Sequence, residues 1–142
     1  MKLTTHFSLE EMTRSATAQR LGICNAPNSQ QIAALRHLCE LLLEPLRLHL
    51  NRPVVINSAF RSPRLNRAVG GSPTSQHLFG EAADIRLASR EEGLEIVRFI
   101  EKNLPYDQMI LEHKSRTNGS AEFWLHLSLR VGGTNRRQTL FW

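Results

Sequence analysis

The sequence predicts one α+β domain, with a small, mainly antiparallel sheet and helices packed against it. Its 142 residues match the usual size of a single domain and are enough to bury a hydrophobic core. Segments with helical periodicity alternate with short β-branched runs. The Asn118-Gly119 turn signal separates two strand-like runs near the C-terminal end, which favours an antiparallel hairpin. We therefore expect residues 1–142 to form a single domain.

Capping signals and apolar periodicity predict two helices in the first third of the chain. Ser8 and Glu11 form a capping box, and the short helix that follows should end near Ser15. A longer helix begins at Ser29, and Pro45 should kink or interrupt it near its end. Its buried face is predicted to comprise Ile32, Leu35, Leu38, Cys39, Leu42 and Leu46.

Two more helices are predicted further along. Ser62 is a suitable cap and Pro63 a suitable first residue for a short helix, which glycines 70–71 should end. A second capping box at 89–92 opens a helix that ends before Pro105. The apolar residues of this helix are Leu94, Val97 and Ile100.

Four strands are predicted at 54–58, 82–87, 107–112 and 123–130, with a long hairpin tip between the last two. Alternation along the last strand separates an apolar face from a face that carries a histidine. The apolar set is Phe123, Leu125, Leu127 and Leu129, and the other set is Trp124, His126 and Ser128. The pattern of the tail, 131–142, is too weak to place it.

The charge balance favours anionic partners. The formal net charge is +5, with small basic clusters at Arg61, Arg64 and Arg67 and at Arg136 and Arg137. Aromatic residues are not interleaved with these cations, so we do not expect nucleic acid binding. No apolar run is long enough for a membrane span or a secretory signal, and synthesis in the cytoplasm is expected.

Two histidines and one aspartate stand out as possible metal ligands. His77 and Asp84 are seven residues apart with Gly80 between them, and His126 follows on the last predicted strand. Three such ligands would leave the fourth position of a tetrahedral zinc ion open, as in catalytic sites. Asp84 is also the odd residue of an apolar strand, where a lone carboxylate is costly unless it is paired or bound to a cation. Spacing alone leaves other readings open: a surface His77, an Asp84 salt bridge, or a satisfied core His126.

Several motifs in the right order resemble the M15 zinc peptidases, in particular their single-domain subgroup. This family includes D-alanyl-D-alanine carboxypeptidases, dipeptidases of vancomycin resistance and phage endolysins. The resemblance implies a Hedgehog/DD-peptidase-like fold and a Zn²⁺ ion bound by His77, Asp84 and His126. Segments 7–11, 43–47, 58–71 and 106–112 also resemble the family. The central motif is Ser75-x-His77-x-x-Gly80-x-Ala82-x-Asp84, followed by Trp124-x-His126-x-Ser128.

The resemblance also suggests a catalytic base. Glu112 ends a predicted strand that resembles a family segment, and that segment also ends in a glutamate. Glu112 is therefore the first choice for the catalytic base. Some relatives have an acidic residue three positions before the last histidine, where this chain has Phe123. Glu122 lies on the predicted His126 face and is the alternative base. Asp107 has the opposite parity to Glu112, so a structural hydrogen-bonding role is expected for it.

Two residues are expected to contact substrate. The arginine that matches Arg61 holds a substrate carboxylate or carbonyl in the family, and a guanidinium suits that task. The alternative is a loop arginine that caps the following helix. Ser75 is expected to bind substrate or to orient His77.

The expected function is hydrolysis of D,D- or L,D-peptide bonds in peptidoglycan stem peptides or cross-links, as by an endolysin. The first alternative is a D-alanyl-D-alanine carboxypeptidase. The second is a non-catalytic zinc-containing module for cell-wall binding or assembly, because the signalling domain of Hedgehog proteins keeps the zinc in a binding role. We expect a monomer whose partners are peptidoglycan peptides and which reaches the wall after release from the cytoplasm.

Overall fold

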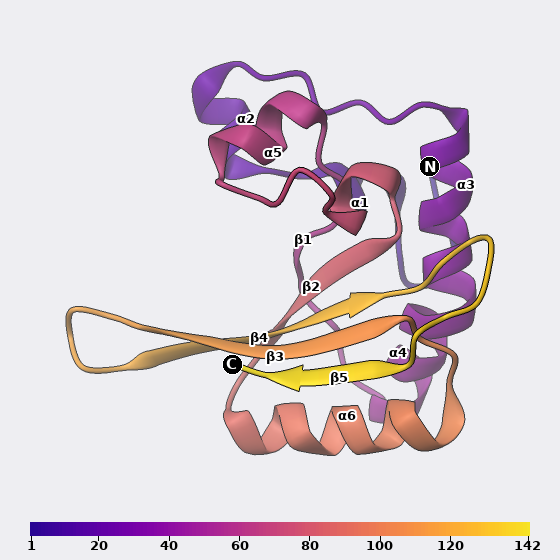
Figure 1. Ribbon diagram of the computed structural model, residues 1–142, viewed down its shortest axis with the longest axis vertical. Coiled ribbons are helices and arrows are strands. Elements are labelled where there is room, and N and C mark those ends of the chain that lie inside the picture. The colour runs from indigo at the N-terminus through magenta and orange to yellow at the C-terminus, as the bar shows by residue number, and fades with distance from the viewer.

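The computed structural model describes residues 1–142 and contains one five-stranded sheet with six α-helices (Figure 1). The strands are β1 (Ile56–Ser58), β2 (Ala82–Leu87), β3 (Gln108–Ser115), β4 (Ala121–Ser128) and β5 (Gln138–Phe141). The helices are α1 (Leu9–Thr13), α2 (Ala16–Leu21), α3 (Ser29–Leu38), α4 (Glu44–Leu50), α5 (Pro63–Ala68) and α6 (Arg90–Asn103). The predicted α+β class is confirmed.

The sheet is mixed, with strand order β1-β2-β4-β3-β5. Neighbouring strands are antiparallel except for β3 and β5, which are parallel. Figure 1 shows α6 along one face of this sheet, while α1, α2 and α5 gather at one end of the molecule. Gly93 brings α6 close to the sheet, because a Cβ atom there would lie 2.6 Å from Leu111 and 2.8 Å from Leu87.

The capping signals located the helices well, with two exceptions. Ser8 and Glu11 form both bonds of the predicted capping box at α1. At α6 only half of the predicted box forms, since Glu92 accepts from the backbone of Ala88 and pairs with Arg52. Helix α2 was not predicted, although Ser15 caps its start and Gly22, at φ 65°, ends it.

The predicted interruption near Pro45 takes the form of a π-helical turn, Cys39–Leu43, between α3 and α4. Glu44 N donates to Cys39 O five residues earlier, so the hydrogen-bond ladder is already offset where Pro45 enters without an N–H group. The helical path therefore continues past the proline. Its apolar face joins the main hydrophobic core through Leu35, Leu38, Cys39, Leu42 and Leu46, all fully buried.

The two faces of the central strands differ in character, as the alternation on β4 predicts. Leu125 and Leu127 are fully buried in the core. On the opposite face, Asp84 of β2 lies directly across from His126 of β4, and Glu112 of β3 lies across from Trp124. Direct partners in a ladder point to the same side of a sheet. Asp84, Glu112 and His126 therefore share one face, away from the core.

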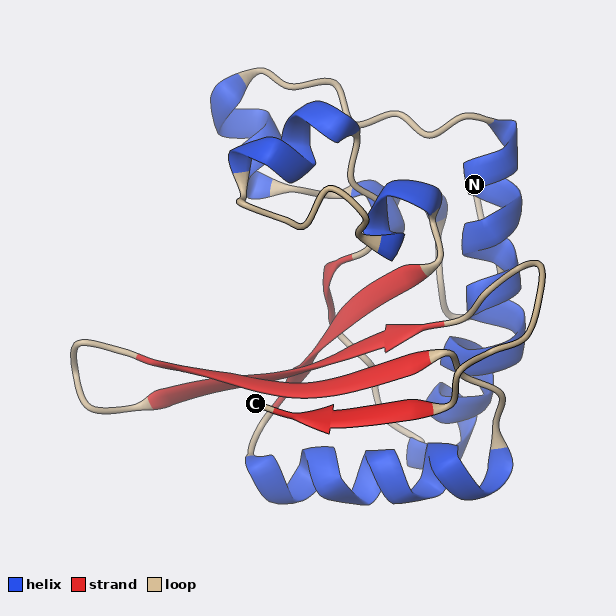
Figure 2. Cartoon of the chain, in the orientation of Figure 1, coloured by secondary structure: helices blue, strands red, loops and turns tan.

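The C-terminal region differs most from the prediction. Strand β3 continues to Ser115, and β4 begins two residues earlier than predicted and ends at Ser128, so the hairpin has a shorter tip than expected. Figure 2 shows this hairpin extending beyond the helices. The unplaced tail returns along β3 and adds β5 as a parallel edge strand. No helix in the structure has the length and apolarity to cross a membrane.

Candidate active site

Three potential metal ligands converge on the polar face of the sheet. Ligand atoms of His77, Asp84 and His126 all lie within 4.8 Å of one another. Asp84 Oδ1 is 3.0 Å from His126 Nδ1 and 3.4 Å from His77 Nε2. The structure therefore brings Asp84 and His126 together, although they are 42 positions apart along the chain.

A short 3-10 turn, Gln76–Phe79, delivers His77 to this cluster. Ser75 caps the turn, and its Oγ accepts from the backbone N–H of His77. Gly80 ends the turn at φ 73°, and a Cβ atom there would lie 2.5 Å from the carbonyl oxygen of Gln31. The turn therefore requires glycine both for its left-handed backbone and for its close packing on α3.

The tautomer of His77 follows from its hydrogen bond to the backbone. Nδ1 lies 2.6 Å from the carbonyl oxygen of Ala59, which can only accept a hydrogen bond. Nδ1 therefore carries the proton and Nε2 presents a lone pair to Asp84. An imidazole lone pair and a carboxylate oxygen 3.4 Å apart repel each other unless a proton or a cation lies between them. The arrangement fits a metal ion held by two imidazole nitrogens and one carboxylate oxygen.

Asp84 stays ionised in this setting. Burial would raise its pKa, but the charge and hydrogen bonds of His77 and His126 in their protonated forms outweigh burial and hold the pKa below its ordinary value. A metal cation in place of those protons would also favour the charged carboxylate. Arg61 adds a further cation, with Nη2 3.6 Å from Asp84 Oδ2.

Arg61 is held by its surroundings rather than extended into solvent. Its Nε donates to Ser58 Oγ and its Nη1 donates to Oδ1 of the buried Asn66, both at 3.2 Å. Gly71 makes room for this pair, because a Cβ atom at that position would lie 2.0 Å from Asn66 Oδ1. Burial lowers the pKa of Arg61, while Asp84 and Glu112 act to raise it. The guanidinium remains charged and faces the cluster.

Glu112 borders the same cavity as the three potential ligands. Its Oε2 accepts a 3.0 Å hydrogen bond from Nε1 of Trp124, its partner across the ladder. Burial and then the charge of Asp84 raise the pKa of Glu112 above its ordinary value, against the opposing effect of Trp124. A raised pKa makes the Glu112 carboxylate a better proton acceptor, as a general base requires.

The other two acidic residues considered from the sequence lie elsewhere. Glu122 is on the same sheet face but does not line this cavity, and its Oε2 is 3.8 Å from Arg116 Nη2. Asp107 is fully buried and accepts hydrogen bonds from Arg136. Burial would raise its pKa, but these bonds and the charges of Arg136 and Arg130 hold the pKa low. The structural role predicted for Asp107 agrees with these contacts.

The cavity measures about 360 Å³ and is polar, with Ile110 as its one hydrophobic lining residue. The sequence-based reasoning missed six of its twelve lining residues as site residues: Ser72, Thr74, Gln76, Gln108, Ile110 and Arg136. Gln108 begins β3 on the same face as Glu112, so strand parity could have identified it. Arg136 lies in the unplaced tail and was noted only as part of a basic cluster with Arg137. Trp124, noted only as part of a motif, orients Glu112.

A polar cavity with two imidazoles, two carboxylates and a guanidinium is typical of metal-dependent hydrolases. The sequence model described as Peptidase M15 matches residues 5–118, and this chain belongs to that peptidase family. The matched region includes His77, Asp84 and Glu112 and ends before His126. A comparison with curated proteins gives no match.

Proposed function

We propose that this protein is a zinc peptidase that hydrolyses peptide bonds in peptidoglycan stem peptides or cross-links. His77, Asp84 and His126 would hold the Zn²⁺. The observation that carries the proposal is the approach of His77 Nε2 and His126 Nδ1 to one oxygen of Asp84, beside Glu112 in a single cavity. Three protein ligands leave a coordination position for catalysis.

Bound zinc would polarise a peptide carbonyl and lower the pKa of water toward about 7. Glu112 supplies the proton transfers. Its Oε2 is fixed by Trp124, and Oε1 makes no hydrogen bond within the chain. Oε1 can therefore take a proton as water adds to the carbonyl carbon and return it to the nitrogen when the C–N bond breaks. Glu122 is the alternative base, and its position outside the cavity makes it the weaker one.

Arg61 and Ser75 would bind the substrate. Arg61 is fixed by Ser58 and Asn66, so its remaining N–H groups can meet a substrate carboxylate or carbonyl with little loss of conformational entropy. The Ser75 oxygen accepts from the backbone of His77, which leaves the hydroxyl hydrogen available as a donor to substrate.

The surface around Asp84 favours cleavage within a peptide. Asp84 also lines a second hollow of about 210 Å³, together with Asn57, Lys114, Glu122 and Trp124. The two hollows share this residue, and we propose that a bound peptide extends from one hollow to the other past the proposed zinc site. This geometry supports an endopeptidase, as in an endolysin, over a D-alanyl-D-alanine carboxypeptidase, whose substrate ends just beyond the scissile bond.

The proposal has further parts, which concern the fold, the oligomeric state and the place of action. We place the chain in a Hedgehog/DD-peptidase-like fold, as one zinc peptidase domain over residues 1–142 that acts as a monomer. The net charge of +5 suits an anionic polymer such as the cell wall. We propose that the protein is made in the cytoplasm, as phage or prophage lysis enzymes are, and acts on the wall after release.

The test uses the zinc-loaded chain and purified cross-linked muropeptides, with products identified by mass spectrometry. We expect loss of cross-linked dimers without release of free D-alanine. The Glu112→Gln variant should lower kcat by roughly 10²–10⁴-fold while zinc stays bound. Glu122→Gln makes the same chemical change on the same sheet face and should retain most of kcat, since Glu122 does not line the cavity of the proposed ligands. Glu95→Gln, on the exposed side of α6, is the control without any expected effect.

Other outcomes would redirect the proposal. Release of D-alanine from pentapeptides without loss of dimers would identify the carboxypeptidase. Tight binding to cell walls without any cleavage, with zinc bound, would identify a non-catalytic wall-binding module. Loss of activity in Glu122→Gln but not in Glu112→Gln would transfer the role of base to Glu122.

A further inference from the structure

Arginines approach the cavity from opposite edges of the sheet. Arg61 follows β1 and Arg136 precedes β5, and these are the two outermost strands. Both arginines line the cavity, with Asp84 and His126 on the strands between them. Arg61 contacts the ligand cluster through Asp84, whereas Arg136 makes no contact with the three potential ligands. Arg136 therefore faces a separate part of the cavity.

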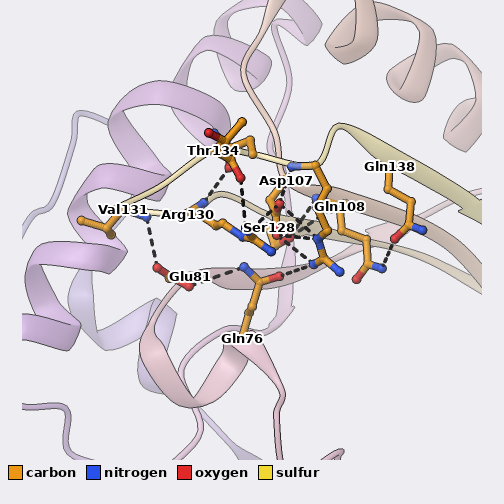
Figure 3. Close-up of polar contacts among 11 residues, drawn as sticks. Gln76, Glu81, Asp107, Gln108, Ser128, Arg130, Val131, Thr134 and Gln138 are labelled. Carbon is orange, nitrogen blue, oxygen red and sulfur yellow. Dashed lines mark hydrogen bonds and ion pairs between the residues drawn. The ribbon is translucent and has the colours of Figure 1, made fainter.

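Arg136 is held firmly by a buried carboxylate. Asp107 accepts from the backbone N of Arg136 at 2.7 Å, from its Nε at 3.2 Å and from its Nη2 at 2.8 Å. The same Nη2 donates to Oε1 of Gln76, in the turn that carries His77, at 3.3 Å. Figure 3 shows this polar network, which connects Asp107 and its surroundings with Gln76. The guanidinium is thus fixed relative to the proposed zinc site.

One side of this guanidinium is still available. Nη1 of Arg136 makes no hydrogen bond within the chain, and the side chain is 42% exposed. Its positive charge is also only partly compensated, because Asp107 is shared with Arg130, whose Nε is 3.3 Å from Oδ1. Asp107 therefore already has a second cation, and a purely structural role does not require Arg136 to face the cavity.

We propose that Arg136 binds a second carboxylate of an acidic peptide substrate, away from the scissile bond. The proposal deepens the proposed function and rests on it for the identity of the substrate. An arginine fixed on one side and open on the other suits a carboxylate. Arg61 would hold the group beside the scissile bond, and Arg136 would select peptides that carry a further negative charge. Arg136 lies beyond the segment that matches the family model.

The test measures binding separately from cleavage. Synthetic stem peptides are prepared with each carboxyl group free or amidated in turn, and their Kd values are measured calorimetrically on the zinc-loaded Glu112→Gln chain, which leaves the peptides intact. We expect one amidation to weaken binding about tenfold, as for a partly exposed hydrogen bond between charged groups. Adding Arg136→Gln should weaken binding of the free-carboxyl peptide by about the same factor. It should also abolish the preference for the free carboxyl group over the amide.

The controls separate a binding role from a structural one. Arg130→Gln removes the other cation from Asp107. Because Arg130 does not line the cavity, this variant should keep the preference for the free carboxyl group. If Arg136→Gln unfolds the chain, the double variant Asp107→Asn/Arg136→Gln removes both charges of the pair together. Unchanged preferences in a folded Arg136 variant, or no effect of any amidation, would overturn the proposal. If the unsubstituted, zinc-loaded protein binds these peptides but does not cleave them, the proposed function is contradicted instead.

Discussion

Trp124 and Glu112 face each other across β4 and β3, and the indole Nε1 donates a 3.0 Å hydrogen bond to Glu112 Oε2. The bond fixes one carboxylate oxygen and leaves the other without a partner in the chain. An oriented carboxylate with one oxygen available for a proton is what general base catalysis requires. The Trp124-x-His126 spacing therefore places a proposed metal ligand and the residue that orients the proposed base on the same face of one strand.

Replacing Trp124 by phenylalanine should move the pH dependence of activity. The indole hydrogen bond stabilises the charged carboxylate and so lowers the pKa of Glu112, against burial and Asp84, which raise it. Without this bond the pKa rises further, and the base becomes unprotonated only at higher pH. The acid limb of kcat/KM should shift upward by roughly half to one pH unit. An unchanged limb, or the same shift in the exposed control Trp142→Phe, would contradict this role.

Zinc should stabilise the fold through the three ligands. A metal ion that binds only the folded chain adds roughly 4 kcal/mol at a free concentration a thousandfold above its Kd. For a domain of this size that corresponds to a Tm rise of roughly 10 °C or more. His126→Ala should abolish most of the rise, whereas His113→Ala, an exposed histidine on β3, should preserve it. Calorimetric scans with zinc and with a chelator provide the comparison.

Gly71→Ala should impair the substrate grip while leaving zinc binding intact. The added Cβ would lie 2.0 Å from Asn66 Oδ1 and 2.8 Å from Arg61 Nη1. The hydrogen bond between Arg61 and Asn66 must therefore break. We expect kcat/KM to fall about tenfold, as for loss of one charged hydrogen bond, with unchanged metal content. Gly132→Ala is the matched control, because a Cβ atom there meets nothing within 4 Å. Equal kinetics in the two variants would count against a role for Arg61.

Asp107→Asn should destabilise the fold, and the effect should depend on pH. Arg136 and Arg130 hold the pKa of Asp107 below its ordinary value although burial opposes them. Its contribution to the free energy of unfolding is therefore present above the unfolded-state pKa, near 3.9, and disappears as pH falls through the lower folded-state pKa. Urea unfolding at pH 7 should show a loss of about 2 kcal/mol that shrinks below about pH 4. The exposed Glu95→Gln should show neither effect.

Much of the sheet and several helix starts could be predicted because their signals are local. A cap such as Ser62 depends on a few neighbouring residues, and the alternation around Leu125 and His126 reflects the two-residue period of a strand. The convergence of His77, Asp84 and His126 is different, since spacing alone left each residue with another explanation. Family resemblance was needed to expect that they meet.

The tail could not be predicted, because its structure depends on partners far away in the sequence. Strand β5 is short and pairs in parallel with β3, about thirty residues earlier, without a hairpin turn to announce the pairing. Arg136 likewise reads as a surface cation until Asp107 is seen to be buried beside it. Charge and composition carry no information about such a contact.

The pairing of Asp84 with His126 across β2 and β4 is fixed by the same strand register that buries the hydrophobic core. A slip of one residue between β2 and β4 would turn His126 toward the hydrophobic core and expose Leu125, at a large cost in stability. Misaligned ligands would therefore also mean a misfolded core. The register that buries the core is therefore the same register that aligns the two proposed ligands, Asp84 and His126. A stably folded chain has both.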